Sequence, residues 1–328
     1  MDALFFSLNA VLPIIIMVLV GYVLKKIGLV DTDFAKKLNK IVFRVFLPVM
    51  LFLNVYKIDD ISVFDFRYIL YAASAALLIF FVSVPIVMLY TPRQDRRGVL
   101  LQSVFRSNYA LIGIPLAGSL FGEAGEIVAS LMSVVTIPIF NILAVVSLTV
   151  FNKEDNKPSV KKVLLGIVKN PLIQAILLGL LVLCVRALLV TWSVEFRLSD
   201  IQPIYKVLGN LSGLATPLAL ISLGAQFEFS AIKELKREII FGVAARTVVV
   251  PLIGLSVAYL AFGNVFNGAH FAAFVALFAT PLAVSTVPMT QEMNGDSSLA
   301  GQIVIWSTIV SGFTIFLTAY ILKLLNVF

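Results

Sequence analysis

The chain contains apolar runs of about 20 residues along its whole length, and this feature restricts the fold more than any other. A helix of that length crosses the hydrocarbon core of a bilayer. Hydrophobic residues make up 60% of the 328 residues and charged residues 13%, which leaves too few polar groups to cover a soluble globule. We therefore predict an all-α polytopic membrane protein with ten transmembrane helices. Their predicted bounds are 4–25, 34–55, 68–90, 99–121, 127–151, 171–191, 203–227, 239–262, 271–289 and 301–325.

Positive charge is concentrated in alternate gaps between these helices. The gaps after the first, third, fifth and seventh hold most of the Lys and Arg residues, whereas the other gaps hold little beyond Lys57, Arg67 and Arg197. By the positive-inside rule, both termini lie outside the cytoplasm, and the protein spans the cell membrane. The net charge of +7 reflects this topology. Since the basic residues are scattered over short loops, we predict the lipid bilayer as a partner and no nucleic acid.

The chain has few residues with which to build a catalytic or metal centre. Cys184 is the single cysteine and lies inside a predicted span, so no intrachain disulfide forms. The single histidine, His270, has no cluster of Cys, His or carboxylates around it in the sequence. We predict neither a metal site nor a cofactor, and no enzymatic activity, because candidate acid and base residues do not converge. The predicted spans also lack Asp, which argues against sodium/proton antiport.

The second half of the chain repeats features of the first. When the two halves are aligned with an offset of about 170 residues, residues 46–51 align with 215–220. Pro115 then aligns near Pro281 and Pro288. The prediction is a five-helix repeat over 1–151, a cytoplasmic linker over 152–170, rich in Lys, Asn and Pro, and a second repeat over 171–328. Since five is odd, the second copy inserts upside down.

Prolines inside the spans predict interruptions of the helices. A proline removes a backbone donor and clashes with the preceding turn, and the freed polar groups are tolerated only where they face protein or a cavity. Breaks at equivalent places in inverted repeats indicate a substrate site near the bilayer midplane, where half-helix N-termini suit a carboxylate. The alternative is an ordinary kink, since proline is common in membrane helices. The predicted break positions are Pro48, Pro115, Pro217, Pro281 and Pro288.

The chain resembles the auxin efflux carrier family, which includes the plant PIN-FORMED auxin exporters and bacterial carriers proposed for malonate and malate. The most specific match is Asn108-Tyr-Ala-Leu-Ile-Gly113-Ile-Pro115, which is similar to the family's segment in helix four. The resemblance covers essentially the whole chain. Further similar positions are Asn39 with Pro48, Thr136 to Asn141, Ser222 to Gly224, Arg246 with Pro251, and Ser307-Thr308.

The resemblance implies crossed, broken helices four and nine, as in bile-acid symporters and sodium/proton antiporters. Helices one, two, six and seven would form a scaffold, and helices three to five with eight to ten a moving transport domain, which is an elevator mechanism. It also implies a homodimer through the scaffold helices. One departure from the plant pattern concerns helix nine: Pro288 precedes Glu292 by only four residues, and Thr286 stands opposite the crossing proline, so the break is open between Pro281 and Pro288.

Polar residues near the predicted breaks are the candidate site. Asn108 offers an amide to a carboxylate or, alternatively, a bond between helices, and Asn141 has the same two interpretations. Arg246 either attracts an anion or pairs with a helix C-terminus, and Glu292 either binds a coupling ion or faces a loop. Arg44 and Arg106 are expected to snorkel to the cytoplasmic surface. The predicted substrate-binding residues are Asn108, Tyr109, Gly113, Pro115, Asn141, Ser285, Thr286 and Pro288.

These observations predict a secondary transporter of small organic anions, which are mono- or dicarboxylates similar to auxin, malonate or malate. The alternative is a membrane-embedded sensor that binds a metabolite without moving it. The coupling ion, H⁺ or Na⁺, if any, is left open, as are the substrate and the direction of transport.

Overall fold

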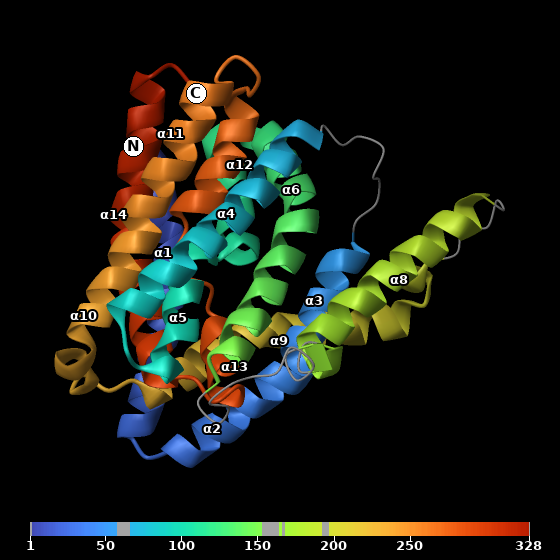
Figure 1. Ribbon diagram of the computed structural model, residues 1–328. Helices are drawn as coiled ribbons and strands as arrows, with labels where there is room; N and C mark the ends of the chain where they lie inside the picture. Colours follow the sequence, from blue (N-terminus) through green and yellow to red (C-terminus); the bar gives the residue numbers. More distant parts are fainter. Residues whose placement is uncertain (1, 58–65, 153–163, 166–167, 192–196, 328) are drawn as a thin grey trace.

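The computed structural model of the chain describes residues 2–57, 66–152, 164–165, 168–191 and 197–327 (Figure 1). In this part, every regular element is a helix, and the only β-pairing is a single antiparallel bridge between Ser107 and Leu282. The elements in chain order are α1 Asp2–Lys26, α2 Thr32–Ile41, η1 Val42–Phe46, α3 Leu47–Tyr56, α4 Phe66–Tyr90, α5 Gln94–Phe105, η2 Tyr109–Gly113, α6 Ile114–Val150, α8 Pro171–Thr191, η3 Leu198–Asp200, α9 Gln202–Gln226, α10 Ala231–Ala244, η4 Ala245–Val249, α11 Val250–Phe262, α12 Gly268–Ala279, α13 Thr286–Glu292 and α14 Ser297–Leu324.

The described helices have the length and composition of membrane spans. Seven continuous helical segments among the described residues are long and apolar enough to cross a bilayer. Large apolar side chains lie on the outside, for example Leu89 and Leu260, which are 88% and 81% exposed. Such exposure would be costly in water and is ordinary in lipid. The protein is therefore an all-helical, multi-pass membrane protein, as the apolar runs predicted.

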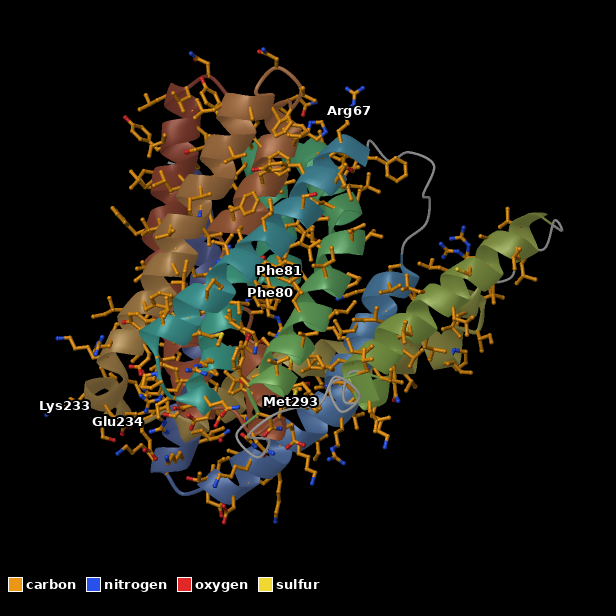
Figure 2. All side chains as sticks on the ribbon, in the orientation of Figure 1. Arg67, Phe80, Phe81, Lys233, Glu234 and Met293 are labelled. Atoms are coloured by element: carbon orange, nitrogen blue, oxygen red, sulfur yellow. The ribbon has the colours of Figure 1, made fainter. Side chains whose placement is uncertain are left out.

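Charged residues mark the two ends of the bundle. Figure 2 shows Arg67 at one end, Lys233 and Glu234 at the opposite end, and Phe80 and Phe81 on α4 between them. The helix that was predicted to begin at residue 239 begins at Ala231, because its first turns are amphipathic rather than apolar. An apolar run marks only the part of a helix that is in hydrocarbon, so the charged extension was missed.

A buried arginine ties three elements together at the charged end of α10. Arg96 of α5 is paired with Glu234 and Glu238 of α10 at 2.8 Å, and with Asp296, just before α14, at 3.1 Å. Burial alone would lower the pKa of Arg96, but the hydrogen bonds to these three carboxylates raise it above its ordinary value. The start of α5 is thus fixed against both α10 and α14.

Three of the described prolines come just after a widened, π-helical turn. Each of the π-helical segments η1, η2 and η4 ends two residues before a proline, at Pro48, Pro115 and Pro251. The residue before each proline donates its N–H to the carbonyl five residues back, as Leu47 does to Val42. The wider turn accommodates the proline ring and its missing N–H.

The prediction of a break was therefore wrong at two prolines. The helix continues from Thr32 to Tyr56 through Pro48, and α9 runs through Pro217 without interruption.

The segment α6 is a helical hairpin. Its backbone leaves the helical region at Phe121 and Gly122, and Gly122 has a φ of 62°, which favours glycine. A Cβ atom added at Gly125 would overlap the Ala117 carbonyl oxygen. In a straight helix, residues eight apart are separated by about 12 Å. The chain therefore reverses here, which joins a short half-helix, starting at Ile114, to a long helix that ends at Val150.

The helices pack in two groups, which touch along one side. The pair α3 and α8 projects from the bundle with α9 beside it, while α4, α5, α6 and α10 to α14 form the larger group (Figure 1). The helix α1 packs against both α9 and α14. The α1–α9 contact is very close, because a Cβ atom at Gly21 or Gly224 would overlap a backbone carbonyl of the opposite helix. These glycines therefore permit the backbones to touch.

Candidate functional site

Two chain breaks meet inside the larger group of helices. The helix α5 ends at Phe105 and α12 ends at Ala279, and the chain resumes helical structure at Tyr109 and Thr286. Between these ends, Ser107 pairs with Leu282, and the Asn108 backbone N–H donates to the Pro281 carbonyl at 2.8 Å. Each break therefore supplies partners for the backbone of the other, which is necessary at membrane depth. This pair of breaks is called the crossing below.

The break in the second half of the chain lies beside Pro281. Residues 280–285 are non-helical, whereas Pro288 lies in the first turn of α13, where a proline is tolerated. Of the two prolines left open by the sequence, Pro281 lies in the break. The predicted break at Pro288 was wrong. In the first half, the break at 106–108 precedes Pro115 by a π-helical turn, so Pro115 begins the second half-helix rather than the break.

The side chain of Arg246 stabilises the ends of both helices that enter the crossing. It is completely buried and donates to the Val104 carbonyl of α5 at 3.1 Å, to the Leu277 carbonyl of α12 at 3.0 Å, and to the Phe278 carbonyl. Helix C-termini have unpaired carbonyls and a partial negative charge. One guanidinium therefore neutralises both, and Arg246 does not line the neighbouring cavity.

A second buried guanidinium, that of Arg106, lies in the crossing itself. It donates to Gln102 Oε1 at 2.8 Å, Met289 Sδ at 2.9 Å, Asn141 Oδ1 at 2.9 Å and Ser285 Oγ at 2.8 Å. All four acceptors are neutral. Within the described part of the chain, Arg106 forms no ion pair. Its charge is therefore held in position, and no carboxylate of the described residues neutralises it.

The amide of Asn108 is next to this charge in the sequence and lacks a partner. Its Nδ2 atom is buried without a hydrogen bond among the described residues. The Asn108 backbone carbonyl accepts from Ile112 and Gly113 and so starts the following helix. A buried unpaired donor costs free energy unless a ligand or water completes it.

A cavity of about 190 Å³ opens at the crossing. One side is formed by the crossing and by the long helix of α6, and the other by α3, α9 and the first turn of α8. The residues that line it are Leu47, Met50, Leu51, Asn54, Arg106, Ser107, Asn108, Tyr109, Ala110, Leu111, Ile137, Phe140, Asn141, Leu172, Ala215, Thr216, Ala219, Ala283, Val284 and Ser285.

Comparisons with known proteins identify the family of this chain. The family described as "Membrane transport protein", which is that of the auxin efflux carriers, matches residues 6–319. The chain belongs to this family. A relative described as an uncharacterized transporter, from Methanothermobacter thermautotrophicus, is 23% identical over 321 residues, which cover 93% of this chain and 95% of the relative. Another of the same description, from Methanocaldococcus jannaschii, is 28% identical over 234 residues, covering 69% and 70% of the two chains. The protein is thus a membrane transporter.

Four of the predicted substrate-binding residues lie at the cavity. Asn108, Tyr109, Asn141 and Ser285 line it. The Tyr109 hydroxyl donates to the Ala129 carbonyl at 3.0 Å, so this residue presents its ring rather than its hydroxyl. Asn141 and Ser285 both accept from Arg106 and so hold its guanidinium in place.

The other predicted residues lie outside the cavity lining. Gly113 permits close packing of η2 against α12, since a Cβ there would lie 3.1 Å from the Ala276 carbonyl oxygen. Thr286 and Pro288 are buried in α13. Glu292 pairs with Arg44 of η1 at 3.6 Å. Its carboxylate therefore joins two helices and is not free to bind an ion.

Arg106 is the candidate site residue that the sequence did not predict. It was expected to snorkel to the cytoplasmic surface, but it is 3% exposed and lies in the crossing. The error follows from placing the break at Pro115. The signal that could have located it is the run Arg106-Ser-Asn108, three polar residues inside an apolar stretch, where an unbroken membrane helix would be expensive.

Proposed function

We propose that the transporter carries small organic anions, mono- or dicarboxylates, bound at the crossing. One observation carries the proposal: the buried guanidinium of Arg106 lines the cavity and donates only to neutral atoms. An unneutralised cation is costly at membrane depth. A bound carboxylate would supply the missing charge and accept a charge-assisted hydrogen bond from the Arg106 Nε–H, since the four bonds above occupy both terminal nitrogens.

Two neighbouring features favour the same ligand. The unpartnered Asn108 amide donates but carries no charge, so it suits an oxygen acceptor. Arg246 already satisfies the carbonyls at the C-terminal ends of α5 and α12, which removes the groups that would attract a cation. The crossing therefore presents donors to the cavity.

We also propose that the fold comprises ten spans in two inverted repeats, over 1–151 and 171–328, joined by 152–170. The two broken helices support this, because α5 and α12 each have 12 residues and each ends at the crossing. The hairpin at Phe121 and Gly122 divides α6 into two spans. In Figure 1, α1 begins and α14 ends at the same end of the molecule, as an even number of spans requires. The extracytoplasmic side for both termini stays a prediction.

The cavity position supports an elevator mechanism. In this proposal α1, the α2–η1–α3 segment, α8 and α9 form the scaffold, and the remaining helices form the transport domain. The cavity is lined from both, so a substrate seated on Arg106 would move away from α3 and α9 when the domains shift. Polar contacts across the boundary include Asn39 with Gln291 at 2.8 Å and Arg44 with Glu292 at 3.6 Å. These contacts would break and re-form in each cycle. The homodimer through the scaffold stays a prediction.

Counterflow in liposomes tests transport against mere sensing. Vesicles containing the purified protein are loaded with an unlabelled carboxylate, and uptake of the labelled acid is followed with and without sodium and at two pH values. We expect accumulation above that of empty vesicles, lost in Arg106→Met. Binding without accumulation would favour a sensor, and neither binding nor accumulation of any acid would contradict the proposal.

A further inference from the structure

The cavity at the crossing contains one cationic side chain. Of its lining residues, only Arg106 is basic, and none is acidic. The other polar groups are amides, hydroxyls and the ring of Tyr109. One fixed positive charge neutralises one carboxylate. The number of charges in the lining therefore limits the number of charges on the ligand.

A second carboxylate would meet an unsuitable wall. Away from Arg106, the lining is mostly aliphatic or aromatic, including Leu51, Ile137, Phe140 and Ala219, all of which are buried. An ionised carboxylate held against such a surface loses its hydration without gaining a positively charged partner. The same wall favours a hydrocarbon body. The cavity thus selects a ligand with one charged end and an apolar middle.

The α3 and α9 side of the cavity holds two neutral polar side chains, Asn54 and Thr216. Both are half-buried, and neither side chain makes a hydrogen bond to another residue in the described part of the chain. An amide and a hydroxyl can each donate and accept, but neither compensates a charge. They suit a hydroxyl, carbonyl or amide on the ligand.

We infer that the substrate is a small monocarboxylate with an apolar body and a neutral hydrogen-bonding group remote from the carboxylate, and that Asn54 and Thr216 recognise this second group. The inference rests on the proposed function and narrows it by excluding dicarboxylates as preferred ligands. In the elevator scheme, Arg106 and Asn108 travel with the substrate, whereas Asn54 and Thr216 stay with the scaffold. The second polar group of the substrate would therefore contact Asn54 and Thr216 in this conformation and lose these contacts when the transport domain moves.

A matched series of four-carbon acids tests the inference: butanoate, 4-hydroxybutanoate and succinate, at a pH where every carboxyl group is ionised. Affinity is measured from the thermal stabilisation of the purified protein as the ligand concentration rises. We expect 4-hydroxybutanoate to bind roughly five- to tenfold more tightly than butanoate, as for one added hydrogen bond. Succinate should bind at least tenfold more weakly than 4-hydroxybutanoate. The five-carbon series, pentanoate, 5-hydroxypentanoate and glutarate, controls for length.

Variants at Asn54 distinguish the effect of charge in the lining from the effect of side-chain shape on ligand preference. In Asn54→Leu, the difference in affinity between 4-hydroxybutanoate and butanoate should disappear. Asn54→Lys places a second cation on the α3 side and should reverse the preference, so that succinate binds more tightly than 4-hydroxybutanoate. Asn54→Met is the matched control of similar length without charge, and Thr216→Lys is a second position should Asn54→Lys not fold.

The outcomes distinguish this inference from the proposed function. If acids bind but succinate equals or exceeds 4-hydroxybutanoate in the wild type, the inference is overturned while anion binding stands. An unchanged preference in folded Asn54→Lys and Thr216→Lys would also overturn it. If no acid of either series stabilises the protein, the anion proposal itself fails.

Discussion

Replacing Arg246 should destabilise the crossing without touching the cavity. In Arg246→Met, the carbonyls of Val104, Leu277 and Phe278 lose their donor. A buried acceptor left without a partner costs about 1–3 kcal/mol, so three cost about 3–9 kcal/mol. The desolvation that is recovered when the buried charge is removed offsets part of this cost. The expected net loss is about 3–5 kcal/mol.

Thermal unfolding in detergent at one fixed scan rate measures this loss. At roughly 2 °C per kcal/mol for a chain of this size, the apparent Tm of Arg246→Met should fall by about 6–10 °C. Arg246→Lys keeps the charge and reaches fewer carbonyls, so its Tm should lie between the two. The control is Arg44→Met, since the Arg44 side chain is 62% exposed and should change the Tm by about 1 °C. An Arg246→Met protein as stable as the wild type would refute the role assigned to this side chain.

Three further predictions follow from particular contacts. Asn108→Ala should lose carboxylate binding at unchanged Tm, because its Nδ2 atom has no partner to lose; retained binding in a folded variant removes it from the site. Gly224→Val should separate α1 from α9 and greatly reduce the yield of folded protein, whereas Gly209→Ala, where a Cβ meets nothing within 4 Å, should express normally; equal yields would show that the close contact is dispensable. A short bifunctional thiol reagent that links Asn39→Cys to Gln291→Cys in a Cys184→Ser background should stop counterflow, because the wild-type amide groups are 2.8 Å apart; undiminished flux after complete cross-linking argues against movement at this boundary.

Span positions could be predicted from the sequence because the bilayer thickness sets the length of the apolar run. The helix predicted over 171–191 is observed as Pro171–Thr191. Helix ends outside hydrocarbon are set by capping and charge pairing instead, so the start of α10 at Ala231 was missed. Length and hydropathy therefore locate a span better than they locate a helix.

Five prolines were predicted to break helices, but the crossing has two breaks, one at 106–108, ahead of Pro115, and one beside Pro281. A proline can be accommodated by a widened turn, as at Pro48, by simple continuation, as at Pro217, or by an initial turn, as at Pro288. Only neighbouring elements decide which of these occurs. The pairing of Ser107 with Leu282 joins positions far apart in the sequence, and no local pattern reveals it.

The candidate site depended on the same long-range contacts. Asn108 was found from its motif, and Asn141 and Ser285 were found near the breaks, but their shared partner was not. Whether Arg106 reaches the surface or the crossing depends on a shift of the break by a few residues. An arginine in a span is costly in either place, so its identity alone did not decide between them.

The central claim is that an anion binds the guanidinium of Arg106, and direct binding to the purified protein tests it. The labelled acid that stabilises the wild type most is titrated by equilibrium dialysis into wild type, Arg106→Lys and Arg106→Met. Arg106→Met should bind at least about tenfold more weakly, as expected for loss of a charge-assisted hydrogen bond of about 1.5–3 kcal/mol, with Arg106→Lys intermediate and all three proteins folded. Wild-type affinity in Arg106→Met would contradict it.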